Sequence, residues 1–144
     1  MKTKKPQFDV FVAYDIEDRS KFTDLLLDRV DSLGIDVWDC AEKNEGQDVV
    51  DIVKKGVAKC RFGIVVMSTR VLKNEMKRKE LVRLLGKRTA GGVQRLLPVF
   101  LGKASPFSFA EGLCEFQFMR HPRDSADRIA LQLAALYLTS IRNI

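Results

Sequence analysis

The sequence predicts a three-layer α/β fold, flavodoxin-like, in which a parallel sheet of about five strands is flanked by helices. Short apolar runs alternate along the chain with segments whose apolar residues recur at helical spacing. The clearest run, Phe62 to Met67, is apolar on both faces, which is typical of a strand buried between two layers of helices. Right-handed connections between the strands make such a fold doubly wound. Doubly wound folds bind ligands at the carboxyl ends of their strands, where we expect the site.

The composition fits one folded domain. The chain has 144 residues, of which 46% are hydrophobic and 31% charged. Residues 1–7 are expected to form a basic extension and residues 8–144 the domain. No apolar run is long enough to span a bilayer, and no apolar signal core follows the basic start. The three widely spaced cysteines, with no Cys/His cluster, predict a reducing, cytoplasmic compartment and no metal site.

The net charge is +6, and basic residues concentrate between Lys73 and Arg95. A basic stripe of this kind can attract nucleic acid, anionic lipid or a phosphorylated small molecule. An equally good interpretation is a solvent-exposed helix face that binds nothing. Because no aromatic residues interleave with the stripe, we expect no specific nucleic-acid partner.

The first half of the chain predicts two strands around one helix. Phe8 to Tyr14 is the first strand, and Asp15 to Asp18 is a polar turn. A helix follows and ends at Gly34, since glycine commonly stands just past the last turn. Its apolar positions are Phe22, Leu25, Leu26, Val30 and Leu33. Ile35 to Trp38 is a short second strand, and a polar loop, Asp39 to Asp48, comes next.

The second half continues the alternation. A second helix is marked by Val49, Ile52, Val53 and Val57, and a third, after the central strand, by Met76, Leu81, Leu84 and Leu85. Arg95 to Phe100 is the fourth strand, and Pro98 within it predicts an edge position or a bulge. Glu115 to Met119 is a candidate fifth strand. Ser125 is expected to cap a last helix carrying Ile129, Leu133, Leu136 and Tyr137.

The motifs that the sequence lacks argue against several classes of enzyme and binding domain. No GxGxxG follows the first strand and no GxxxxGK[ST] is present, which argues against a dinucleotide-binding Rossmann domain and a P-loop NTPase. A phospho-receiver would need an aspartate where Ser68 ends the third strand, although Asp15 and Asp18 resemble part of its acidic cluster. Ser68 also lacks the GxSxG context of a serine nucleophile.

Several motifs occur together and in order between residues 8 and 101: Phe8 to Tyr14, Glu17 to Arg19, Leu33 to Trp38, Glu45-Gly46, Lys59 to Ser68, Lys79 to Leu81 and Leu97 to Phe100. Each is weak alone. In this order and spacing they resemble the Toll/interleukin-receptor (TIR) domain, and Lys59 to Ser68 resembles the third strand of its bacterial-type, NAD-cleaving branch.

The resemblance implies a signalling module of innate immunity or anti-phage defence. TIR domains associate with one another through the loop after the second strand, where Glu45, Gly46 and Gln47 stand in this sequence. Many members also cleave NAD+ to nicotinamide and ADP-ribose or a cyclic ADP-ribose. NAD+ is then a substrate, and no cofactor is required. Their catalytic glutamate corresponds to Glu80.

A physical case for Glu80 stands beside the resemblance. On a helix, Met76, Glu80 and Leu84 form one row, so Glu80 is expected to interrupt an apolar row near the strand ends. A carboxylate beside the ribose stabilises the positive charge of an oxocarbenium-like state. Three neighbouring cations favour its ionised form and suit a pyrophosphate: Lys77, Lys79 and Arg83. The alternative is an ordinary surface acid paired with these cations.

Five further residues at strand ends are expected to border NAD+: Tyr14, Asp15, Glu42, Lys43 and Ser68. Two positions depart from the family pattern, because Met76 replaces a usual tryptophan and Ala13 a frequent serine. Two functions therefore stay open, an NAD-cleaving enzyme and a non-catalytic adaptor that acts through TIR–TIR contacts.

Overall fold

The computed structural model describes residues 8–38, 48–87, 92–104 and 118–142. Its sheet has five parallel strands in the order β2-β1-β3-β4-β5. The strands are β1 (Phe8–Ala13), β2 (Val37–Trp38), β3 (Cys60–Met67), β4 (Leu96–Leu101) and β5 (Met119–His121).

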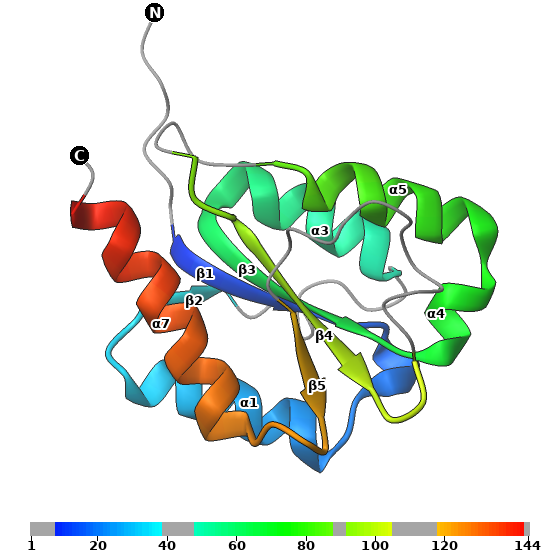
Figure 1. Ribbon diagram of the computed structural model, residues 1–144, viewed down its shortest axis with the longest axis horizontal. Coiled ribbons are helices and arrows are strands. Elements are labelled where there is room, and N and C mark those ends of the chain that lie inside the picture. Colours follow the sequence, from blue (N-terminus) through cyan, green and yellow to red (C-terminus); the bar gives the residue numbers. More distant parts are fainter. Residues whose placement is uncertain (1–7, 39–47, 88–91, 105–117, 143–144) are drawn as a thin grey trace, which may run out of the picture.

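Helices cover both faces of the sheet (Figure 1). One face carries α3 (Val49–Lys59), α4 (Thr69–Lys73) and α5 (Glu75–Leu85), and the other carries α1 (Lys21–Ser32) and α7 (Ala126–Arg142). The predicted three-layer, flavodoxin-like α/β fold is confirmed.

The central strand β3 is buried on both faces, as its apolar run predicts. Val65 and Met67 pack in the core beneath α3 and α5, while Ile64 and Val66 pack in the core beneath α1 and α7. All four side chains are 0% exposed. Alternate residues of a strand point to opposite faces, so β3 contributes to both cores.

Two glycines allow α3 to approach the sheet closely. A Cβ atom at Gly56 of α3 would lie 2.6 Å from the ring of Phe11, and one at Gly63 of β3 would lie 2.4 Å from it. Both distances are shorter than a carbon–carbon contact permits. The ring of Phe11 therefore occupies the space that the two missing side chains leave.

The first helix begins and ends at residues whose chemistry predicts it. Ser20 accepts a hydrogen bond from the Thr23 amide, and Thr23 accepts one from the Ser20 amide, which forms a reciprocal capping box. Gly34 follows the helix with φ of +76°, a left-handed conformation that glycine adopts without strain.

The third predicted helix, marked from Met76 to Leu85, is α5, and a short helix that was not predicted, α4, precedes it and ends at Asn74. This residue is extended, with φ −84° and ψ 109°, and its side-chain oxygen accepts a hydrogen bond from the Lys77 amide at 3.1 Å. It therefore ends α4 and caps a new helix, α5. Of the residues predicted to mark the buried face, Leu81, Leu84 and Leu85 are buried, whereas Met76 is 81% exposed.

Pro98 predicted that β4 lies at an edge or carries a bulge. The edge position is wrong, because β3 and β5 flank β4, and the register of β4 with β3 is continuous from Leu96 to Phe100. Pro98 pairs with Val65 of β3, and β5 joins the other side only from Val99 onward. A missing amide donor is tolerated where the second neighbour has not yet begun to pair. The described fifth strand is Met119–His121, so it continues past Met119, where the expected strand ended; residues 115–117 of the expected strand lie outside the described residues.

The last helix lies against the sheet as its apolar spacing predicts. Ile129, Leu133 and Leu136 are buried, and the hydroxyl of Ser125 accepts a hydrogen bond from the Arg128 amide at 3.2 Å, which confirms the predicted cap. Throughout the part of the chain that the structure describes, no helix has both the length and the apolarity needed to cross a membrane.

Candidate functional site

A polar cleft of about 390 Å³ opens at the carboxyl ends of β1 and β3. Its lining residues come from three segments that follow these strands or precede α3: Asp15, Ile16, Glu17, Asp48, Arg70, Asn74 and Lys77. The sheet order changes direction between β1 and β3, which makes this edge the switch point where flavodoxin-like folds bind ligands. The predicted location of the site is therefore where the cleft lies.

Asp15 is the most buried acid of the cleft, at 6% exposure. Its Oδ1 accepts a hydrogen bond of 2.7 Å from the Val49 amide, which is the first N–H of α3. An anion at this position is stabilised by an otherwise unpaired amide and by the positive end of the helix dipole. Asp15 thus joins the end of β1 to the start of α3.

Lys77 extends from α5 into the same cleft. Its ammonium lies 3.8 Å from Oδ2 of Asp15 and 3.7 Å from Oδ2 of Asp48. Asp48 is also the N-cap of α3, since its Oδ1 accepts a hydrogen bond of 3.0 Å from the Asp51 amide. One lysine therefore connects the helix α5 with both β1 and α3.

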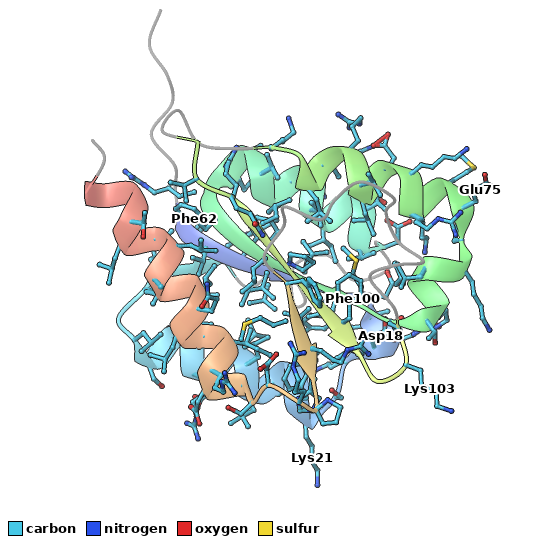
Figure 2. All side chains as sticks on the ribbon, in the orientation of Figure 1. Asp18, Lys21, Phe62, Glu75, Phe100 and Lys103 are labelled. Atoms are coloured by element: carbon cyan, nitrogen blue, oxygen red, sulfur yellow. The ribbon has the colours of Figure 1, made fainter. Side chains whose placement is uncertain are left out.

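A second ionic cluster lies between α4 and the short 3-10 helix η1 (Ile16–Asp18), and two of its residues, Glu17 and Arg70, line the cleft. Arg70 donates to Glu17 and, at 2.5 Å, to Asp18. The hydroxyl of Ser68 donates to the other oxygen of Asp18 at 2.8 Å and accepts from the Val71 amide at the start of α4. Figure 2 labels Asp18, whose partner Arg70 belongs to α4. The charge of Arg70 is thereby engaged by two carboxylates.

Glu80 lies on α5, one turn beyond Lys77, and is not among the residues that line the cleft. Its Oε2 accepts hydrogen bonds from Arg83, with both Nε and Nη2 at 3.0 Å, and its side chain is 40% exposed. The expected apolar row around Glu80 is not present, because Met76 points to solvent while Leu84 is buried.

Only one of the three cations expected near Glu80 contacts it. Arg83 pairs with Glu80, and Lys77 pairs with the cleft aspartates. Lys79 lies 3.1 Å from Glu75, and its hydrogen bond and charge, followed by the charge of Arg78, lower the pKa of Glu75. The tertiary structure assigns different carboxylates to cations that are neighbours in the sequence.

The remaining predicted binding residues differ in where they lie relative to the cleft. Asp15 lines the cleft, Ser68 is buried beside it at 9% exposure, and Tyr14, at 2%, lies in the core beneath α1 and α7. Glu42, Lys43, Glu45, Gly46 and Gln47 lie outside the described residues. The roles assigned to all of them, and to Glu80, stay predictions.

Sequence reasoning selected Lys77 only as one of three cations near Glu80, and it did not select Asp48, Asn74 or Arg70 as parts of the site. Asn74 carried a usable signal, because asparagine before a charged helical segment is typical of an N-cap. Lys77 carried none. Its place between two carboxylates depends on the packing of α5 beside α3, which the local sequence does not encode.

Comparison with known proteins identifies the fold's family. The family model of the TIR domain matches residues 10–134. The chain belongs to the TIR family.

This TIR domain is 30% identical over 137 residues to the NAD(+) hydrolase PdTIR of Paracoccus denitrificans, covering 93% of this chain and 46% of that protein. It is 26% identical over 137 residues to the 2' cyclic ADP-D-ribose synthase AbTIR of Acinetobacter baumannii, covering 93% of this chain and 51% of that protein. The TIR domain thus spans about half the length of these relatives.

A solved structure supports the fold independently. The TIR domain resembles a metazoan TIR-STING receptor from C. gigas, solved in complex with 2',3'-cGAMP, with a TM-score of 0.68 and 16% identity. The match covers 95% of this chain and 41% of that receptor. At this identity the likeness concerns the fold alone.

Proposed function

We propose that this TIR domain cleaves the nicotinamide–ribose bond of NAD+ and releases nicotinamide with ADP-ribose or a cyclic ADP-ribose. The activity serves signalling of the innate-immune or anti-phage type, in the cytoplasm, and Glu80 is the catalytic carboxylate. The observation that carries the proposal is the position of Glu80, one helical turn from Lys77 in the polar cleft at the switch point of the sheet. The chain that has this cleft is similar to an NAD+ hydrolase and to a cyclic ADP-ribose synthase.

The chemistry requires one carboxylate near the reacting ribose. The C–N bond breaks with its electron pair going to nicotinamide, which leaves as a neutral molecule, and the ribose passes through an oxocarbenium-like state. An ionised Glu80 stabilises that positive charge. Water then attacks to give ADP-ribose, or a hydroxyl of the same molecule attacks to give a cyclic product; in either case the attacking oxygen loses its proton to solvent.

Glu80 must leave Arg83 to act on a ribose in the cleft. The pair is solvent-exposed, with side-chain exposures of 59% for Arg83 and 40% for Glu80. Exposed pairs of this kind contribute about 1 kcal/mol or less. Rotation of Glu80 toward a bound substrate therefore costs little compared with the energy of binding.

The direct test is incubation of the purified protein with NAD+ and measurement of free nicotinamide by chromatography. We expect nicotinamide and an ADP-ribose product in equal amounts, with the product's mass distinguishing hydrolysis from cyclisation. An absence of nicotinamide at high protein concentration, from a folded sample, would contradict the proposal.

One observation favours the second candidate, a non-catalytic adaptor. Met76, 81% exposed, stands where the family usually has tryptophan, and Ala13, fully buried, stands where active members often have serine. An exposed methionine offers a flexible apolar contact to a partner protein. The adaptor function predicts TIR–TIR association without release of nicotinamide, so the same assay separates the two candidates.

We further propose that the domain assembles through the loop from Asp39 to Asp48, most of which lies outside the described residues. The expected contact is head-to-tail: the loop of one copy binds a different surface of the next copy. Contacts of this heterologous kind can repeat from copy to copy and build strips or filaments. If a neighbouring copy completes the NAD+ site, activity per molecule rises with protein concentration. The expected result is a specific activity that increases across a dilution series together with light scattering.

Substitution of Gly46 tests the role of this loop. Gly46→Val introduces a β-branched side chain, which disfavours a positive φ and adds bulk at a predicted contact surface. We expect both scattering and NAD+ cleavage to fall in parallel. A constant specific activity from a monomer, unchanged in Gly46→Val, would exclude assembly as a requirement and leave the enzymatic proposal intact.

A further inference from the structure

The ammonium of Lys77 lies between two carboxylates that have matching arrangements. Each aspartate uses Oδ1 to accept a hydrogen bond from the first turn of α3: Asp15 from the Val49 amide and Asp48 from the Asp51 amide. Each presents Oδ2 to Lys77, at 3.8 Å for Asp15 and 3.7 Å for Asp48. The two carboxylates are therefore held by α3, and the lysine of α5 lies between them.

Removal of the Lys77 charge would leave two carboxylates facing the cleft without the cation between them. Arg70 is the other cation among the described lining residues, and Glu17 and Asp18 already engage it. Like charges in a partly buried site repel one another. The start of α3 and the start of α5 would then move apart or take up solvent.

The backbone of Lys77 is anchored as well as its side chain. The Lys77 amide donates to the Asn74 side chain at 3.1 Å, which caps α5. Glu80 follows three residues later, about 4.5 Å along the helix axis and about 60° around it. A contact that fixes the first turn of α5 therefore also fixes the rotation of the turn that carries Glu80.

We infer that Lys77 is a positioning residue for Glu80: by bridging Asp15 and Asp48 it holds α5 in the rotation that lets Glu80 reach a substrate in the cleft. The inference rests on the proposed function. It makes Lys77 act on the rate of bond cleavage through the placement of Glu80, not on the affinity for NAD+. A displacement of about 1 Å at a reacting group is enough to lower a rate about 100-fold.

The test compares three variants. Lys77→Met removes the charge and keeps much of the side-chain length, Lys77→Arg keeps the charge, and Lys54→Met makes the same chemical change at an exposed lysine of α3 that does not line the cleft. We expect Lys77→Met to lower kcat about 10- to 100-fold with KM within twofold. Lys77→Arg should recover most of kcat, and Lys54→Met should match wild type.

Hydrogen exchange provides a second measurement that does not depend on turnover. Without NAD+, amides in the first turns of α5 should exchange faster in Lys77→Met than in wild type, and should be unchanged in Lys54→Met. Circular dichroism should show that all three variants are folded. Loss of kcat together with faster exchange confined to α5 supports positioning.

Three results would overturn the inference. A raised KM with unchanged kcat would mean that Lys77 binds the substrate directly. A lowered kcat with unchanged exchange in α5 would mean that it acts on the reacting atoms. Wild-type kcat in Lys77→Met would refute the inference alone, whereas a wild-type protein that releases no nicotinamide would refute the proposed function itself.

Discussion

We expect Glu80→Gln to abolish the proposed NAD+ cleavage while the fold stays intact. The amide keeps the shape of the side chain and still accepts a hydrogen bond from Arg83, whose guanidinium lies 3.0 Å from Glu80. It loses the negative charge that stabilises an oxocarbenium-like state. Loss of one preorganised electrostatic contact lowers kcat about 100-fold or more. The measurement is nicotinamide release per molecule of folded protein.

Glu75→Gln is the matched control for this prediction. Glu75 lies on the same helix and pairs with Lys79 at 3.1 Å, with its side chain 67% exposed. Both variants replace a glutamate with glutamine, but Glu75 does not line the cleft. We expect near wild-type turnover from this variant. If Glu80→Gln also retained near wild-type turnover, another group would have to be the catalytic carboxylate.

Val65→Asp prevents folding. Val65 is fully buried in β3, in the core beneath α3 and α5. It also pairs with Ala13 of β1 and Pro98 of β4, so the carboxylate would lie in the middle of the sheet. Burial of an unpaired charge costs several kcal/mol, which is comparable with the roughly 5–15 kcal/mol that stabilises a domain of this size. We expect little soluble protein and no cooperative thermal transition.

Leu131→Asp is the matched control for the core substitution. Leu131 lies on the outer side of α7 and is 59% exposed, so a charge there remains in water. Effects of surface changes are usually within about 0.5 kcal/mol. A soluble Val65→Asp protein with an unchanged melting temperature would contradict the placement of β3 at the centre of the sheet.

The order of the strands and of the longer helices could be predicted from the sequence, because each depends on local chemistry, whereas the short helix α4 was not predicted. The continuous apolar run of β3, the capping residues Ser20 and Ser125 and the positive φ of Gly34 follow from side chains within a few residues of one another. The same holds for the position of the cleft, since strand order in a doubly wound sheet determines which edge binds ligands.

Errors arose where a local signal competed with a neighbour in space. Pro98 predicted an edge strand, but β5 begins to pair at Val99 and so leaves β4 in the interior. Met76 fitted an apolar row, but it lies in the first turn of α5 and is 81% exposed.

The sequence alone determined the family, the layered architecture and the choice of Glu80 as the candidate carboxylate, because these depend on the order and spacing of residues along the chain. Only the tertiary structure decided which charges from separate segments meet. Asp15, Asp48 and Lys77 come from three separate segments, yet they meet at one corner of the cleft. Ion pairs depend on distances of a few ångströms. Those distances are set by the packing of α5 beside α3 on the sheet rather than by position along the chain.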